Sequence, residues 1–188
     1  MKHISSIINT TAYFLFSCIL VSCNNQSSNK MSLEETQKSS SELVDERVLI
    51  TATLDSFNST AARADYEGYF SYFTDDAVFI GTDATERWDK QQFMGWAKPY
   101  FDKKSTWNFT SVSRNIYFSS TGDLAWFDEL LSTQMKICRG SGVVIKQNDK
   151  WKIQQYVLSM TFPNSKIDKV IKLKAAEEDS ILKAISVK

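Results

Sequence analysis

Two neighbouring carboxylates in the second half of the chain, Asp128 and Glu129, have the chemistry needed for acid–base work. They lie in a stretch of alternating residues, which predicts a β-strand. Because successive side chains of a strand point to opposite faces, only one of the two can face the interior, and periodicity does not choose between them. A carboxyl group surrounded by apolar residues has a raised pKa and can act as a general acid or base. Either residue is therefore a candidate catalytic group.

An arginine and a glutamine on the two following strands are expected beside that carboxylate. By alternation, Arg139 in the predicted strand 135–146 and Gln155 in the predicted strand 151–162 point inward, and Tyr156 points outward. A buried guanidinium needs an acceptor, because an unpaired buried charge is very costly. We expect Arg139 and Gln155 to bind a ligand next to the acid. The alternative is a structural ion pair that joins the strands.

Four of the five tryptophans can supply apolar walls for such a site. They are Trp88, Trp96, Trp107 and Trp126. Indole rings bury a large area and keep one polar N–H, so they suit a core and a pocket equally well. We expect these four to line a pocket, and the alternative is that they fill the core.

The N-terminus has the features of a bacterial lipoprotein signal. Lys2 precedes an apolar stretch, residues 12–21, which as a helix would be roughly 15 Å long, about half of a bilayer core. The stretch ends in Leu-Val-Ser-Cys at residues 20–23, which resembles a lipobox. We therefore expect a signal peptide over residues 1–22, lipidation of Cys23, and a polar, flexible tether over residues 23–41.

This signal predicts where the protein resides. Several acyl chains hold a protein on a membrane firmly. No acidic run follows Cys23, so we expect the periplasmic face of the outer membrane in a bacterial cell envelope.

Cleavage at this site would remove several kinds of chemistry from the mature protein. The only histidine is His3, so no Ser-His-Asp or Cys-His relay and no histidine-ligated zinc or haem remains. Cys138 would be the only free thiol, and we expect it in the core. The chain has 22 basic and 22 acidic residues with no basic stripe, which argues against nucleic-acid binding. We expect no metal and no cofactor.

The elements that position these residues come in a characteristic order, with helices first and strands after. Helices are expected over residues 42–64, after Asp65 and after Asp89, with a short strand at 77–80 between them. Long strands follow over residues 107–118, 124–133, 135–146 and 151–162, and an amphipathic helix over residues 165–187. This order predicts an α+β fold in which N-terminal helices pack on a curved antiparallel sheet, with a C-terminal helix. A long sheet that bends around helices has the shape of a cone, and the open end of the cone can form a pocket.

Three segments carry a resemblance to a known family. The segments VFIGTDATERW at 78–88, GDLAWFDE at 122–129 and WKIQQYVLS at 151–159 are similar to the SnoaL-like branch of the nuclear transport factor 2-like superfamily. The resemblance covers residues 42–164 and leaves residues 165–188 as the C-terminal amphipathic helix. It implies a cone-shaped fold that serves isomerases, cyclases, dehydratases, hydrolases and binding domains. Many relatives carry a histidine in the last strand where this chain has Val157, so a catalytic role there is not expected.

Three functions are compatible with these residues. A membrane-tethered module that binds a small, partly apolar molecule needs only the pocket, and we favour it. A cofactor-independent enzyme of isomerase, dehydratase or hydrolase type would use Asp128 or Glu129 as general acid or base. A protein-interaction module, such as a homodimer joined through the outer face of the sheet, is the third. Asp83 and Glu86 lie in a loop near the expected mouth of the cone, where loop capping is the ordinary role.

Overall fold

The computed structural model describes residues 26–186, so the expected signal peptide and Cys23 lie outside the described residues. A division between Ser39 and Ser40 separates the N-terminal part of the chain from the unit that carries the sheet. Helix α1 (Gln26–Ala62) includes residues for which the sequence predicts a flexible tether. Residues 26–41 contain neither glycine nor proline, the two residue types that disfavour a helix most strongly.

The helices of the main unit begin where side chains cap them. The buried face of α1 is formed by Ile50, Leu54, Phe57 and Ala61, as their spacing predicts. Asp65 accepts a hydrogen bond from the Gly68 amide (2.9 Å) and starts α2 (Tyr66–Ser71). Asp89 and Gln92 form a capping box at the start of α3 (Lys90–Asp102). Pro99 lies inside α3, and the helix ends three residues later.

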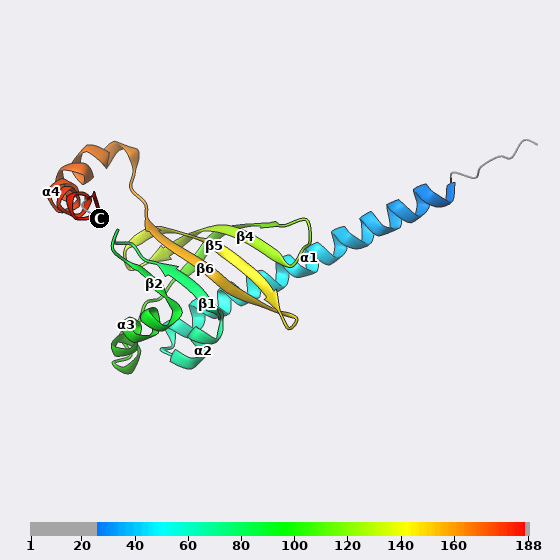
Figure 1. Cartoon of the computed structure of the whole chain (residues 1–188), viewed down its shortest axis with the longest axis horizontal. Coiled ribbons are helices and arrows are strands. Elements are labelled where there is room, and N and C mark those ends of the chain that lie inside the picture. The colour runs from blue at the N-terminus through cyan, green and yellow to red at the C-terminus, as the bar shows by residue number, and fades with distance from the viewer. Residues whose placement is uncertain (1–25, 187–188) are drawn as a thin grey trace, which may run out of the picture. The chain divides into compact units, whose positions relative to one another are not determined.

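Six strands form one sheet in the order β2-β1-β6-β5-β4-β3. Their bounds are β1 Phe73–Ile80, β2 Arg87–Asp89, β3 Thr110–Phe118, β4 Leu124–Thr133, β5 Lys136–Gln147 and β6 Lys150–Met160. Neighbouring strands are antiparallel except β1 and β6, which run parallel. The α+β fold predicted from the sequence is confirmed, whereas the parallel pair and the short strand β2 were not predicted. Helices α2 and α3 lie below β1 and β2 in the view of Figure 1.

Two irregularities in the register decide which side chains face inward. Strand β3 is bulged between Ser111 and Ser113. In β6 the pairing skips from Ile153 to Gln155, so Gln154 is an extra residue. After this bulge the alternation is inverted, and Tyr156 rather than Gln155 faces the core. The prediction for these two residues is therefore wrong.

The core lies between the helices and the inner face of the sheet, and it is rich in aromatic rings. Phe57 stacks on Tyr69 with ring centroids 4.5 Å apart, and Tyr69 packs edge-on against Phe73. Cys138 is fully buried, as expected. A 3-10 turn (Asn164–Lys166) leads to helix α4 (Ile167–Ser186), none of whose residues is buried. Of the helices described, none is long and apolar enough to cross a membrane.

Candidate ligand-binding pocket

A cavity of about 240 Å³ opens between α3 and the inner face of the sheet. This exceeds the roughly 150 Å³ of an apolar cavity that binds benzene, so the cavity suits a small molecule. Most of its lining is aromatic or aliphatic: Phe79, Trp88, Phe93, Trp96, Trp107, Phe109, Met135 and Leu158. The remaining lining residues are Gly81, Thr82, Glu86 and Gln134.

Short-range geometry brings the rings of this cavity together. Trp88 on β2 is paired in register with Phe79 on β1, so both rings stand on the same face of the sheet. Phe93 and Trp96 lie three residues apart on α3 and therefore share one face of the helix. Phe93 stacks on Phe79 (3.9 Å between centroids), and Trp88 stacks on Trp96 (4.9 Å). Trp96 is 39% exposed, which places it at the mouth of the cavity.

Three of the four tryptophans expected to form pocket walls, Trp88, Trp96 and Trp107, line this cavity. The fourth, Trp126, does not. It is 47% exposed on the outer face of β4 and stacks on Tyr117, its partner in register on β3. Its neighbours in sequence, Ala125 and Phe127, are buried on the inner face, so alternation requires Trp126 to face outward.

Of the two candidate acids, Glu129 faces inward and is 1% exposed. Its Oε2 accepts hydrogen bonds from Arg114 Nε (2.9 Å) and Nη2 (2.7 Å), and its Oε1 accepts one from the Tyr156 hydroxyl (3.0 Å). Asp128 lies on the outer face, where it accepts a hydrogen bond from Asn115 Nδ2 (3.2 Å). Both oxygens of the inward carboxylate are therefore occupied by protein groups.

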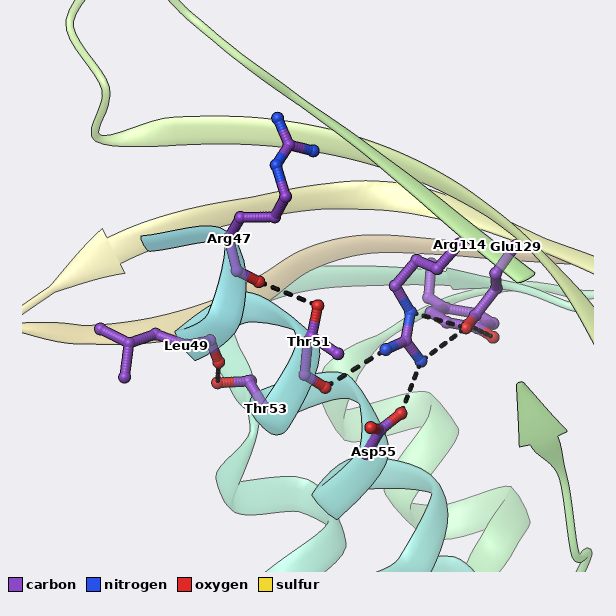
Figure 2. A network of polar contacts seen from close by, with 8 residues as sticks. Arg47, Leu49, Thr51, Thr53, Asp55, Arg114 and Glu129 are labelled. Atoms are coloured by element: carbon purple, nitrogen blue, oxygen red, sulfur yellow. Dashed lines mark hydrogen bonds and ion pairs between the residues drawn. The ribbon is translucent and has the colours of Figure 1, made fainter. Parts of the chain in front are cut away.

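The guanidinium that pairs with the inward acid is Arg114, not Arg139. The Arg114 side chain is 7% exposed, and it also donates to the Thr51 carbonyl on α1 (3.2 Å) and contacts Asp55 Oδ1 (2.9 Å). Figure 2 shows Arg114 between Glu129 and the two residues of α1, with dashed lines to each. This network joins α1 to the sheet.

Arg139 is exposed on the outer face of β5, contrary to the prediction. The opposite face of this strand is buried, and there it carries small residues, Cys138 and Gly140. The strand needs a glycine at 140, because a Cβ there would lie 2.4 Å from the Tyr156 hydroxyl oxygen and 3.0 Å from Glu129 Oε1. The pattern of apolar residues therefore indicates the wrong face of β5. The buried face has small residues because side chains of the neighbouring strands, such as Tyr156 and Glu129, lie over it.

Gln155, expected to bind a ligand from inside the cone, lines a separate polar depression. The depression also contains Asp76, Arg87 and Gln154, and neither Gln155 nor Arg139 belongs to the lining of the aromatic cavity. The residues predicted as one cluster are thus divided between two faces of the sheet.

Burial controls the ionisation of the core tyrosines. Burial, together with the nearby Glu129 carboxylate, raises the pKa of Tyr156 well above its ordinary value. Burial likewise raises the pKa of Tyr69. Tyr156 is consequently a neutral hydroxyl that donates to Glu129, and the anionic charge of Glu129 is balanced by Arg114.

Among the residues that the structure describes, Glu86 is the only charged one in the lining of the aromatic cavity. Its Oε2 accepts a hydrogen bond from the Asp83 amide (3.2 Å), and Asp83 in turn accepts from Thr85. Loop capping, the ordinary role expected for both acids, is therefore present, and Glu86 lines the cavity as well. Within the part of the chain that the structure describes, no group of three acidic, histidine or cysteine side chains is arranged to hold a metal ion.

Comparison with known proteins relates this architecture to one family. A model of the SnoaL-like domain matches residues 50–163. A search of curated proteins finds no match.

Similar solved structures agree on the fold. A nuclear transport factor 2-like protein of unknown function from Pseudomonas putida is 14% identical, with a TM-score of 0.53 over 61% of this chain and 86% of that one. A candidate aromatic ring hydroxylase from Novosphingobium aromaticivorans is 15% identical, with a TM-score of 0.55 over 64% and 92%. A candidate scytalone dehydratase from the same organism is 12% identical, with a TM-score of 0.55 over 66% and 89%. At these identities the likeness extends to the fold alone.

Proposed function

Because this chain belongs to the SnoaL-like family, in the nuclear transport factor 2-like superfamily, we propose that it binds a small, partly apolar molecule in the aromatic cavity. The observation that carries the proposal is the cavity itself, about 240 Å³ in volume and walled by Trp88, Trp96 and Trp107. Apolar walls with a few polar groups are typical of small-molecule sites.

The state of the predicted acids favours binding over catalysis. Both oxygens of Glu129 are occupied by Arg114 and Tyr156, and the residue does not line the cavity. Asp128 lies on the outer face. Neither can exchange a proton with a molecule in the cavity as it stands, because a general acid or base must be within hydrogen-bonding reach of its substrate.

A direct test uses the full-length protein, purified in mild detergent from its own cell envelope and examined by native mass spectrometry. We expect one small molecule bound per chain. Gln134 lines the cavity from an exposed turn, so Gln134→Trp should fill the space without disturbing the core, and the bound mass should be lost. The matched control, Gln147→Trp, changes another exposed residue next to a hairpin turn and should keep it. A bound mass retained by Q134W would contradict the proposal.

Catalysis remains a second candidate because one carboxylate, Glu86, does lie on the cavity wall. The same preparation tests it. The recovered molecule is incubated with catalytic amounts of fresh protein and its mass and chromatographic behaviour are followed over time. Chemical change that the Glu86→Gln variant abolishes would favour an enzyme, and an unchanged molecule would favour a binding protein.

We further propose that the domain is held on a membrane through a lipid on Cys23, at the periplasmic face of the outer membrane. The support is the lipobox-like sequence of residues 20–23 after a short apolar stretch. In cells, Cys23→Ser should block processing and lipid attachment, so the acylated N-terminal peptide should vanish from the mass spectrum. External protease should digest the wild-type protein only after the outer membrane is opened. Digestion of intact cells would refute the periplasmic placement.

An interaction role through the outer face of the sheet has one observation in its favour. Val112, Tyr117 and Trp126 are large apolar side chains that all lie exposed on β3 and β4. If they join two copies of the chain, sedimentation of the full-length protein should show a dimer, which Trp126→Glu should dissociate. A monomer at all concentrations would exclude this homodimer.

A further inference from the structure

We propose that the ligand of the aromatic cavity is an organic cation, a protonated or quaternary amine with a small apolar body. This inference rests on the proposed binding function and names the class of molecule that the site selects. Its basis is the combination of one carboxylate with several indole and phenyl rings.

The carboxylate is that of Glu86, in the loop between β1 and β2. Among the described residues, no lysine or arginine pairs with it, and the Asp83 amide is the group that donates to its Oε2 (3.2 Å). The Glu86 carbonyl also accepts from the Gly81 amide (2.9 Å), which holds the loop against the end of β1. A negative charge thus faces the cavity without a positive partner.

Glycine at position 81 lets this carboxylate lie against the strand. A Cβ on Gly81 would be 2.1 Å from Glu86 Oε2 and 3.0 Å from Glu86 Cδ, so any larger residue would displace the acid. Gly81 and Glu86 both line the cavity. Because Gly81 has no side chain, the Glu86 carboxylate has room to lie at the cavity wall.

The aromatic rings complement the charge of Glu86. The face of an indole ring is electronegative and attracts a cation held over it, more strongly than phenyl or phenol rings do. Trp88, Trp96 and Trp107 contribute three indoles. Within residues 26–186, no lysine, arginine or histidine belongs to the lining. An anion would be repelled by the Glu86 carboxylate, and a neutral molecule would gain no attraction from its charge. A compact cation would be attracted both by the faces of the aromatic rings and by the carboxylate of Glu86.

The test compares two probes of similar shape that differ in charge, choline and 3,3-dimethylbutan-1-ol, by quenching of tryptophan fluorescence in the full-length protein. We expect choline to bind at least tenfold more tightly than the neutral alcohol. Glu86→Gln keeps an acceptor for the Asp83 amide but removes the charge. It should weaken choline binding at least fivefold and leave the alcohol unchanged within twofold.

The matched control is Asp83→Asn. Asp83 lies three residues before Glu86 and carries the same charge, but its side chain does not line the cavity. This variant should change choline binding less than twofold. Trp96→Leu, at the exposed mouth, should weaken choline at least threefold more than it weakens the alcohol. It also provides an independent measurement if the Glu86 variant fails to fold.

Equal affinity for the two probes, unchanged choline binding in E86Q, or no binding of choline would each overturn the cation assignment. The binding function itself is judged separately, by the bound mass that Q134W should remove. A neutral or anionic molecule recovered in that experiment would refute the cation and leave the binding function intact.

Discussion

Replacing Glu129 by glutamine should destabilise the fold, because the change leaves a buried guanidinium without its principal counter-charge. The side chain of Glu129 is fully buried and that of Arg114 is 7% exposed, and their closest atoms are 2.7 Å apart. Glutamine has nearly the same size, so no cavity is created. Its carbonyl oxygen can still accept hydrogen bonds from Arg114, but the charge-assisted pair is lost.

The size of the effect follows from the remaining partners of Arg114. Removing one member of a buried ion pair destabilises a protein by about 3–5 kcal/mol. Asp55, whose side chain is 59% exposed, stays 2.9 Å from Arg114, and the Thr51 carbonyl is also retained. These contacts should limit the loss, so we expect the free energy of unfolding to fall by about 3 kcal/mol in Glu129→Gln.

The assay is urea unfolding of the full-length protein in mild detergent, followed by tryptophan fluorescence. Asp128→Asn is the matched control, since Asp128 is the next residue in sequence but lies on the outer face; it should change the free energy of unfolding by less than about 0.5 kcal/mol. Replacing Arg114 and Glu129 by methionine and Tyr156 by phenylalanine, which removes all three polar groups of the network, should recover stability to within about 1 kcal/mol of wild type. A change below about 0.5 kcal/mol in Glu129→Gln would refute the reasoning.

Three further predictions use the same unfolding or fluorescence measurements. Burial raises the pKa of Tyr69 and Tyr156, so the stability that their phenolic protons contribute is complete below pH ~10 and is lost as the pH rises above it. In urea melts between pH 9 and 11, Tyr156→Phe should lessen the total fall in the free energy of unfolding over this range by about 1.4 kcal/mol. Gly140→Ala should destabilise the fold by about 1–3 kcal/mol, because the new methyl would lie 2.4–3.0 Å from buried polar groups. Gly95→Ala has open space around it on α3, so it should stabilise the fold by up to about 1 kcal/mol. Trp126→Leu, on the outer face, should leave the affinity for cavity probes unchanged within twofold, and a larger loss would show that this tryptophan contributes to binding.

Local signals in the sequence predicted the elements well. The Asp89–Gln92 capping box starts α3, and the strand over residues 124–133 has the expected bounds. Such features depend on residues close together in the chain. A helix cap is a hydrogen bond between residues three apart, and a strand is recognised from the alternation of its own side chains. Strand β2 and the parallel pairing of β1 with β6 depend on contacts between distant segments, which periodicity does not encode.

The aromatic half of the site was easier to predict than the polar half. Trp88, Trp96 and Trp107 line the cavity, and an indole ring suits an apolar wall as well as a core. Arg139 was misplaced because β5 buries its small residues, Cys138 and Gly140. A pattern of apolar residues identifies the buried face of a strand only where the side chains of that strand fill the space over it.

A bulge precedes each of the two polar partners of Glu129, Arg114 and Tyr156. Without the bulge between Ser111 and Ser113, alternation from Ser111 would turn Arg114 outward; with it, Arg114 pairs directly with Glu129 across β3 and β4. In β6, the extra residue Gln154 turns Tyr156 inward in the same way. Two separate insertions thus bring a guanidinium and a hydroxyl to the same carboxylate. Because each bulge inverts the alternation after it, a prediction that counts faces from one end of a strand fails at the positions where this network forms.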